Sequence, residues 1–351
     1  MRFPDVYIVT GALGWLGKRL VRLLASRSLD HPWLRALPPA HIRCLVMPGQ
    51  APSELQQMGE SIEAVTGDLR TADDCARLCE GARNGVIIHT AGIIHPRRIR
   101  ELYAVNVEGT RNLLGAAAAA GIRRAVIVSS NSPMGYNPHA DHLFDEDSPY
   151  NPYMNYGRSK MLMEQVAHAC ARWGAMETVI IRAPWFYGPD QPPRQTLFFS
   201  MIRRGKVPLV GDGNNLRSMA YVDNLCQGLL LAALTTQAAG RVYWIADRRP
   251  YSMNEIIGTV ERLLEEEYHL PVAHKRLRMP SIVGDVAELA DFMIQRLGFY
   301  HQKIHVLSEM NKTIACSTAK AEKELQYSPT IALEEGMRRS IAWCLEQGLS
   351  I

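Results

Sequence analysis

The feature that most constrains the fold is a strand, a glycine-rich turn and a helix in direct succession near the start of the chain. Residues Val6–Thr10 (VYIVT) form an apolar, β-branched run, which is typical of a buried strand. The glycines of TGALGWLG follow at residues 10–17, and apolar side chains then recur at helical spacing up to Ser26. Each glycine of such a turn permits a close approach of the backbone, and the helix N-terminus presents free N–H groups to a phosphate. We therefore predict a nucleotide-binding turn.

The alternation of strands and helices continues to about residue 181. Apolar, β-branched runs predict further strands at residues 42–46, 63–66, 85–89, 125–129 and 178–181. Helical patterns lie between them at residues 72–80, 101–120 and 153–173. Short apolar strands that alternate with helices are typical of a parallel sheet covered on both faces. The predicted class is α/β, with a Rossmann-type doubly wound parallel sheet.

The pattern changes beyond residue 182, and residues 188–213 are rich in proline and glycine. Helices are then predicted at residues 222–234, 253–267, 283–297 and 333–347, with a strand at 242–246. We expect residues 1–185 to form a dinucleotide-binding domain. Residues 186–351 are expected to form a smaller C-terminal substrate lobe that returns some elements to the core sheet. The substrate cleft should lie between lobe and core, at the carboxyl edge of the sheet.

The segment 283–297 has an apolar face. One side of its predicted helix carries Val286, Leu289, Ala290, Met293 and Leu297. We expect this face to pack inside the lobe, and peripheral contact with a membrane is the alternative.

Charge and cysteine content exclude several classes of protein. The 39 basic and 35 acidic residues give a formal net charge of +4 without a long basic run, so we expect no nucleic-acid partner. The seven cysteines form no CxxC pair, which argues against a metal site and fits a reducing cytoplasm. The N-terminus runs directly into a strand, and no apolar stretch approaches the ~20 residues of a spanning helix. We expect a cytoplasmic protein without an integral membrane segment.

The sequence YGRSK places Tyr156 and Lys160 one helical turn apart, on the same helix face. A free phenol has a pKa of about 10, and a neighbouring ammonium lowers that pKa toward the working range of a proton donor. Tyr136, Tyr150 and Tyr153 lack a lysine at this spacing. The pair therefore predicts general acid–base chemistry.

A serine cluster ends the predicted strand 125–129, in AVIVSSNSP. A hydroxyl at the carboxyl end of a central strand faces the cleft, where it can hold a substrate oxygen. We assign this role to Ser130. Ser129 is expected to face back into the sheet, and Ser132 precedes Pro133 in a turn.

With these motifs the chain resembles the extended short-chain dehydrogenase/reductase family, also called the NAD-dependent epimerase/dehydratase superfamily. The matching pieces are TGALGWLG, GDL (67–69), HTAG (89–92), VNVEGT (105–110), VIVSSNSPMG (126–135), YGRSK, RAPWFYGP (182–189) and STAKAEKELQYSP (317–329). The resemblance implies an NAD(P)-dependent enzyme with Ser130, Tyr156 and Lys160 as its catalytic residues. It also implies a small-molecule substrate and a homodimer formed through the helices 101–120 and 153–173.

The resemblance further implies the residues that contact the cofactor and the substrate. Asp68 would contact the adenine amino group, Lys160 would also bind the nicotinamide ribose, and Asn106 fits a buried structural role as well as a cofactor contact. The implied cofactor contacts are Thr10, Gly11, Gly14, Trp15, Leu16, Gly17, Asp68, Leu69, Thr90, Ala91, Gly92, Asn106, Ser129, Tyr156, Lys160 and Pro184. The implied substrate contacts are Ser132, Trp185, Phe186 and Arg217.

The end of the second strand departs from the family pattern. Members that bind NAD usually carry an acid there, which holds the ribose hydroxyls. This chain has Val46 and Met47 at that place, and its next acid is Glu54. No arginine replaces the acid, and Arg43 lies inside the strand. The missing acid removes repulsion against a 2′-phosphate, so we expect NAD(P) with a slight preference for NADP(H).

Three functions fit this framework. The first is a 3β-hydroxysteroid dehydrogenase-like oxidoreductase, which the aromatic Trp185 and Phe186 favour because they suit an apolar ligand. The second is a nucleotide-sugar epimerase or dehydratase with tightly held NAD, because Arg217 resembles an arginine that binds a sugar nucleotide's phosphate. An ion pair of Arg217 with Asp212 or Asp223 is the alternative. The third is a non-catalytic dinucleotide sensor, which the complete set of catalytic residues argues against.

Overall fold

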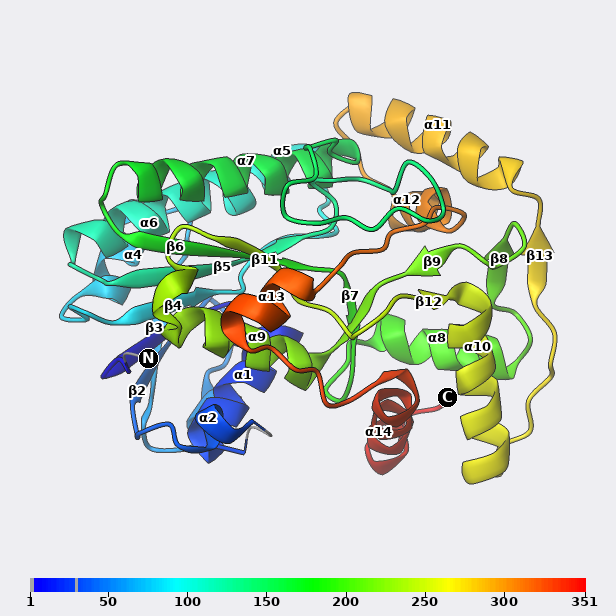
Figure 1. Ribbon diagram of the computed structural model, residues 1–351, viewed down its shortest axis with the longest axis horizontal. Helices are drawn as coiled ribbons and strands as arrows, with labels where there is room; N and C mark the ends of the chain where they lie inside the picture. Colours follow the sequence, from blue (N-terminus) through cyan, green and yellow to red (C-terminus); the bar gives the residue numbers. More distant parts are fainter. Residues whose placement is uncertain (1–2, 29–30) are drawn as a thin grey trace.

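The computed structural model describes residues 3–28 and 31–351, and its core is a seven-stranded parallel sheet in the order β11-β6-β5-β4-β1-β2-β3 (Figure 1). Its strands are β1 (Val6–Thr10), β2 (His41–Val46), β3 (Ile62–Thr66), β4 (Val86–His89), β5 (Arg124–Ser130), β6 (Glu177–Ala183) and β11 (Val242–Trp244). The chain order reverses between β1 and β4, as in a doubly wound fold. The predicted Rossmann-type sheet is confirmed.

Helices cover both faces of this sheet. One face packs against α1 (Trp15–Ser26) and α9 (Val222–Leu234), and the other against α4 (Ala72–Cys79), α6 (Thr110–Ala119) and α7 (Met154–Arg172) (Figure 1). Within β1, Tyr7 and Val9 pack with the first set of helices, whereas Ile8 packs with the second. Both sides of the strand are therefore buried, which explains why the sequence runs apolar without alternation.

The expected helix 101–120 differs from the structure. It consists of α5 (Ile99–Leu102), the π-helical segment η1 (Tyr103–Gly109) and α6. The predicted helix 253–267 likewise comprises α10 (Met253–Arg262) and the π-helical η3 (Leu263–Glu267). Apolar periodicity indicates a helix in each case, but it does not distinguish a widened turn from a regular one.

The later part of the chain forms the lobe and also completes the core. Strand β11 pairs with β6, and α9 packs on the same sheet. The division at residue 185 stays a prediction. The remaining elements are α2 (Pro32–Arg35), α3 (Ser53–Gln56), β7 (Trp185–Tyr187), α8 (Pro193–Arg203), β8 (Pro208–Val210), β9 (Leu216–Arg217), β10 (Met219–Tyr221), η2 (Thr236–Ala238), β12 (Tyr251–Ser252), β13 (Leu277–Met279), α11 (Ile282–Arg296), α12 (Gln302–Glu309), α13 (Ala319–Leu325) and α14 (Leu333–Glu346).

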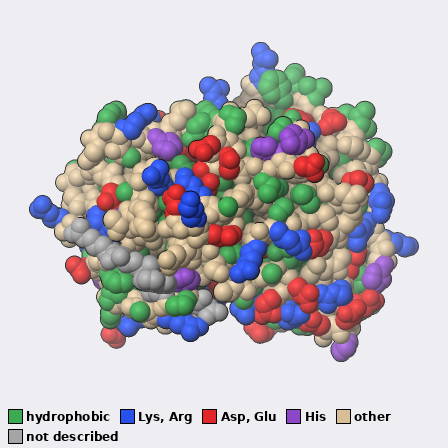
Figure 2. All heavy atoms as spheres, viewed as in Figure 1, with side chains coloured by type: hydrophobic (Ala, Val, Ile, Leu, Met, Phe, Trp, Pro, Cys, Tyr) green, Lys and Arg blue, Asp and Glu red, His purple; other side chains and the backbone are tan. Residues whose placement is uncertain are grey.

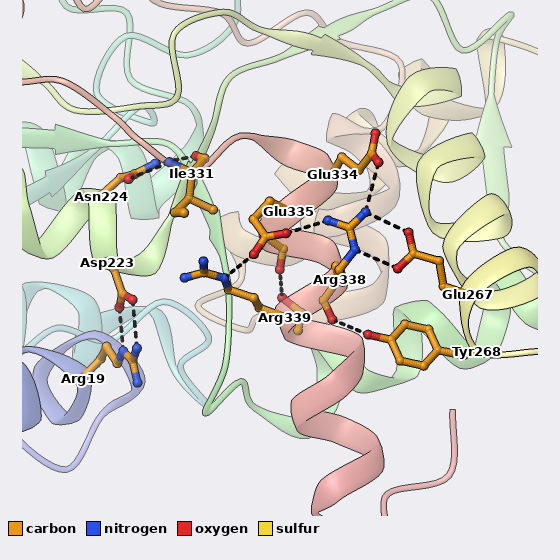
Figure 3. A network of polar contacts seen from close by, with 12 residues as sticks. Arg19, Asp223, Asn224, Glu267, Tyr268, Ile331, Glu334, Glu335, Arg338 and Arg339 are labelled. Carbon is orange, nitrogen blue, oxygen red and sulfur yellow. Dashed lines mark hydrogen bonds and ion pairs between the residues drawn. The ribbon is translucent and has the colours of Figure 1, made fainter. Parts of the chain in front are cut away.

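A polar network holds the C-terminal helix α14 against the rest of the lobe (Figure 3). Arg338 pairs with Glu267 at 2.7 Å, and its backbone carbonyl accepts a hydrogen bond from the Tyr268 hydroxyl at 3.0 Å. Arg339 pairs with Glu335 one turn earlier at 2.6 Å. The contacts of Arg338 with Glu267 and Tyr268, together with the buried Ile341 and its neighbours, hold α14 beside η3 and α10.

The apolar face of the segment 283–297 does not pack inside the lobe, so that expectation is wrong. Helix α11 is buried along Gly284, Ala287, Asp291 and Gln295 instead. Val286, Leu289, Met293 and Leu297 remain more than half exposed. The packed side of α11 thus consists of small and polar side chains, and Asp291 and Gln295 make hydrogen bonds on that side. In the part of the chain that the structure describes, no helix is both long and apolar enough to cross a membrane.

Candidate active site

The glycine turn between β1 and α1 leaves no room for side chains. Gly11 has φ +70°, and a Cβ on it would lie 2.7 Å from the Ala91 nitrogen. A Cβ on Gly17 would lie 2.1 Å from the Gly11 carbonyl oxygen. The first turn of α1 carries no acidic residue, and among the described residues no side chain caps its N–H groups. Free donors with positive partial charge are therefore available, which fits the phosphates of a dinucleotide.

A buried histidine supports this turn from β4. The His89 imidazole is hydrogen-bonded to the Thr10 hydroxyl at 2.7 Å and to the Thr110 hydroxyl at 2.9 Å. Burial lowers the pKa of His89 to about 3, so the ring is neutral at physiological pH. The Thr90 hydroxyl donates to the Thr10 carbonyl at 2.7 Å. The hydroxyls of Thr10 and Thr90 thus tie β1 to β4, a role that the HTAG motif alone did not reveal.

Asn106 has a structural role. Its side-chain oxygen accepts a hydrogen bond from the Ile93 N–H at 2.9 Å. Its amide nitrogen donates to the Ile93 carbonyl at 3.0 Å and to the Ser159 hydroxyl at 3.0 Å. This fully buried amide fixes the backbone after Gly92 against α7. The structural role expected for Asn106 is therefore present, and a cofactor contact of this residue stays a prediction.

The structure brings Ser130, at the end of β5, to Tyr156 in the first turn of α7. Burial raises the pKa of the Tyr156 phenol to about 12, and its hydrogen bond with the Ser130 hydroxyl opposes this shift. Two charges act on the phenol as well: Glu309 raises its pKa and Arg194 lowers it. The phenol is therefore protonated at neutral pH in the isolated protein.

Lys160 is buried behind this pair. Its ammonium donates to the Val128 carbonyl at 2.8 Å. Burial lowers the pKa of Lys160 to about 8, against the opposite effect of Glu164. An effect of Lys160 on the pKa of Tyr156 stays a prediction, and so does a contact of this ammonium with the nicotinamide ribose.

Ser129 faces the opposite side of β5 from Ser130. Its hydroxyl donates to the buried Glu164 at 2.5 Å, and Glu164 also pairs with Arg182 at 3.0 Å. The Tyr150 hydroxyl donates to the same carboxylate at 2.8 Å. This network anchors α7 to β5 and β6. Ser129 faces back into the fold, as we expected, and a cofactor contact of this residue stays a prediction.

Aromatic residues follow the strand that pairs with Ser130. Strand β6 pairs Ala183 with Ser130, and Trp185 and Phe186 come shortly after Ala183 in β7. The centroid of the Phe186 ring lies 4.6 Å from that of the Trp15 ring, so Phe186 contacts the start of α1. The Trp185 ring lies 5.6 Å from that of Phe198. Ser132 is also close, because its hydroxyl is 3.3 Å from that of Ser130.

The NAD dependent epimerase/dehydratase family model matches residues 7–246. The chain belongs to this family. An uncharacterised protein of Sinorhizobium fredii is 52% identical over 98% of this chain and 96% of its own length. A 3 beta-hydroxysteroid dehydrogenase/Delta 5-->4-isomerase of Mycobacterium tuberculosis is 33% identical over 71% of this chain and 66% of its own length. DesIV, a dTDP-glucose 4,6-dehydratase of Streptomyces venezuelae solved with NAD bound, superposes with a TM-score of 0.75 at 25% identity, covering 97% of each chain.

This protein is thus an enzyme of the epimerase/dehydratase family, of the extended short-chain type, and its cofactor is a nicotinamide adenine dinucleotide. At the end of β2 this chain lacks the acid that NAD-binding members of the family usually carry there. Met47 is half exposed there, and Arg43 is turned away, bound to Glu63 at 2.8 Å and to the carbonyl of Leu78 at 3.0 Å. Hydrogen bonds from Arg70 lower the pKa of Asp68. A contact of Asp68 with adenine stays a prediction.

In this family member the two ion pairs considered for Arg217 do not form. Asp223 pairs with Arg19 at 2.5 Å (Figure 3), and Asp212 accepts hydrogen bonds from Asn214. The Arg217 guanidinium instead donates to the backbone carbonyl of Glu309, and burial lowers its pKa. Arg217 therefore lies beside the residue whose carboxylate acts on Tyr156.

Sequence reasoning missed the lobe residues that surround the phenol. Besides Glu309 and Arg194 they include Tyr300, whose hydroxyl is hydrogen-bonded to His95 at 2.7 Å. The pKa of Tyr300 is raised by burial and that of His95 is lowered to about 4, again mainly by burial. These residues come from α8, α12 and two loops. They share no motif, so only the packing of the lobe could reveal them.

Proposed function

We propose that this enzyme is an NAD(P)-dependent dehydrogenase that transfers a hydride between the nicotinamide and a secondary alcohol or ketone of a largely apolar, sterol-like substrate. The observation that carries the proposal is the pair of aromatic residues Trp185 and Phe186, which follows the strand that pairs with Ser130. Such side chains suit an apolar ligand, since they offer large surface and little hydrogen bonding. The relative from Mycobacterium tuberculosis, named as a hydroxysteroid dehydrogenase, supports the same substrate class.

The side chains support proton transfer at the substrate oxygen. A bound nicotinamide would supply or accept the hydride at carbon. In the reducing direction Tyr156 donates its proton to the carbonyl oxygen, and Ser130 donates a hydrogen bond that polarises the same oxygen. In the oxidising direction the phenolate accepts the hydroxyl proton. Burial raises the pKa of Tyr156 to about 12, so the protein favours the protonated form that reduction needs.

Cofactor preference, assembly and location belong to the same proposal. The half-exposed Met47 in place of an acid leaves room for a 2′-phosphate, which supports a slight preference for NADP(H). A cytoplasmic homodimer through α6 and α7 would cover the half-buried Met161, Leu162 and Val166 on α7.

The second candidate is a nucleotide-sugar epimerase or dehydratase with tightly held NAD. Arg217 favours it, because an arginine beside Glu309, whose charge acts on Tyr156, could bind a diphosphate. The similar structure of DesIV, named as a dTDP-glucose 4,6-dehydratase, points the same way. We rank it second because the Arg217 guanidinium is already bound to a backbone carbonyl.

The first experiment is to purify the enzyme without added nucleotide, denature it, and identify the released material by absorbance and chromatography. An empty protein that then binds NADPH or NADH reversibly is expected for an exchanging dehydrogenase. The preferred nucleotide also tests the role of Met47. Near-stoichiometric NAD⁺ would overturn the proposal in favour of the epimerase, to be followed with UDP-sugars.

A further inference from the structure

Helix α11 presents a row of large apolar side chains to solvent. We call the α11 surface the set Ile282, Val286, Leu289, Phe292, Met293, Leu297 and Phe299. Leu289 is 64% exposed and Leu297 is 73% exposed, and the other members are all close to half exposed or more. Isolated apolar residues on a surface are ordinary, whereas a continuous row on one helix face marks a contact with another body.

Arginines from a distant segment surround one end of this surface. The Arg98 backbone pairs with Phe299, and the Ile99 N–H donates to the Gly298 carbonyl at 3.1 Å. The Arg98 guanidinium carbon lies 4.5 Å from the centroid of the Phe299 ring. This pairing brings the basic cluster of residues 97–100 next to Arg296. We call the arginine rim the exposed Arg97, Arg98, Arg100 and Arg296.

The acids of α11 offset these cations only in part. Asp285 and Glu288 share one cation, Lys312, at 2.9 and 3.0 Å, which leaves one negative charge toward the start of the helix. Asp291 is fully buried and hydrogen-bonded to His305 at 2.7 Å. Within the described residues the arginine rim forms no ion pair, although the Glu101 carboxylate accepts a hydrogen bond from the Arg97 backbone N–H at 3.1 Å. The outer side of α11 is therefore apolar, with the arginine rim at its C-terminal end and the exposed Arg278 before its start. Figure 2 shows hydrophobic side chains together with Lys and Arg along the upper edge, where Figure 1 places α11.

We propose that the α11 surface docks this enzyme on an anionic lipid bilayer, with α11 lying in the plane of the interface. Apolar side chains of such a helix enter the boundary between headgroups and acyl chains, and flanking arginines bind the lipid phosphates. A second copy of the chain fits less well. Two antiparallel α11 helices would place Arg278 of one copy near the arginine rim of the other, so like charges would meet.

The α11 surface is on the side of α11 that faces away from the candidate active site. The inner side of α11 reaches the start of α7, where the Gln295 side chain accepts a hydrogen bond from the Asn155 N–H at 3.1 Å. A hollow of about 320 Å³ lies there, lined by Tyr136 and Tyr153 from the core and by Glu288 and Phe292 from α11. Docking would place this region at the bilayer surface. The inference does not depend on which substrate the enzyme uses.

Vesicle flotation of the full chain tests the proposal. The protein should float with vesicles of phosphatidylcholine and phosphatidylglycerol, and less with phosphatidylcholine alone. The variant Leu289→Gln/Met293→Gln should bind at least about tenfold more weakly, because two apolar side chains no longer enter the lipid. Arg97→Gln/Arg296→Gln should lose the preference for phosphatidylglycerol. The matched control is Trp173→Gln, since Trp173 is 81% exposed beyond the opposite end of α7 and should not contribute.

Two results of the flotation experiment would overturn the proposal. One is no flotation of the wild type with either kind of vesicle, and the other is equal flotation of the wild type and Leu289→Gln/Met293→Gln. A dimer in light scattering that this variant dissociates, without vesicle binding, would assign the surface to a second copy. Equal melting temperatures for wild type and variants show that a loss of binding is not a loss of folding. Nucleotide binding should also be unchanged in all of them.

Discussion

The side-chain oxygen of Gln295 accepts two hydrogen bonds from Asn155, one from its backbone N–H at 3.1 Å and one from its side-chain amide at 3.0 Å. Asn155 immediately precedes Tyr156, and Tyr103 donates to its side-chain oxygen at 2.7 Å. Met154, one residue earlier, has φ +49°, a conformation that non-glycine residues adopt only when neighbours hold it. The lobe helix α11 therefore orders the backbone that positions the candidate catalytic phenol.

Replacing this contact should slow turnover without affecting the cofactor. In Gln295→Ala the start of α7 loses both hydrogen bonds, so we expect kcat to fall by about three- to tenfold. KM should change less, and the nucleotide Kd should stay the same. Steady-state kinetics and nucleotide titration measure these values. The exposed Gln302→Ala on α12 is the control, and an unchanged kcat in Gln295→Ala would contradict the positioning role.

Tyr156→Phe should abolish turnover, because it removes the hydroxyl that exchanges the proton. It leaves the glycine turn intact, so nucleotide affinity should be nearly that of the wild type. The expected kcat/KM is below about a tenth of the wild-type value. Tyr268→Phe, whose hydroxyl binds only within the lobe network, is the matched control. Retention of more than that fraction in Tyr156→Phe would contradict proton transfer by the phenol.

The glycine turn can be tested with two alanine substitutions. In Gly17→Ala the new Cβ would lie 2.1 Å from the Gly11 carbonyl, so the turn must shift and nucleotide binding should weaken by at least about tenfold. Gly115→Ala on α6 meets no atom within 4 Å and should leave binding unchanged while stabilising the helix by about 0.5–1 kcal/mol. Isothermal titration and thermal unfolding measure the two effects. Equal nucleotide affinity in both variants would exclude the turn as the phosphate site.

The buried His89 should make the protein sensitive to acid. Its pKa is lowered to about 3 in the folded state, against about 6.5 in an unfolded chain. Between these values the unfolded state binds a proton that the folded state does not. The free energy of unfolding should therefore fall as pH falls below about 6.5, by at most about 1.4 kcal/mol per pH unit, and this effect is absent above that pH.

Denaturant unfolding of His89→Gln at several pH values measures this contribution. The variant should show a shallower decline below pH 6.5, at some cost in stability at neutral pH from the altered bonds to Thr10 and Thr110. The control Gln302→Ala, which removes no titratable group, should keep the wild-type slope. If His89→Gln also keeps that slope, other groups cause the acid sensitivity.

Arg217→Ala separates the two candidate functions. The variant should change kcat/KM for an apolar ketone by less than about threefold, because such a substrate offers no charged partner. A sugar nucleotide would lose a charge-assisted bond, with affinity about ten- to a hundredfold weaker. Arg249→Ala, which removes an exposed pair with Glu255, controls for the loss of a cation. A large loss of UDP-sugar binding in Arg217→Ala would favour the epimerase.

The sequence alone determined those features that depend on residues close to one another in the chain. The strand, glycines and helix of residues 6–26 predicted the nucleotide turn, because backbone conformation and apolar spacing depend on near neighbours. The spacing of Tyr156 and Lys160 likewise predicted a shared helix face, and the order of strands and helices predicted the parallel sheet.

The tertiary structure alone decided which distant residues meet. It placed Glu309 and Arg194 near Tyr156, bound the Lys160 ammonium to the Val128 carbonyl, and turned the apolar face of α11 outward. The physical reason is that periodicity shows which face of a helix is apolar, but not which element covers it. That choice depends on packing between segments far apart in sequence, where small and polar residues such as Gly284 and Gln295 gave α11 a different buried side.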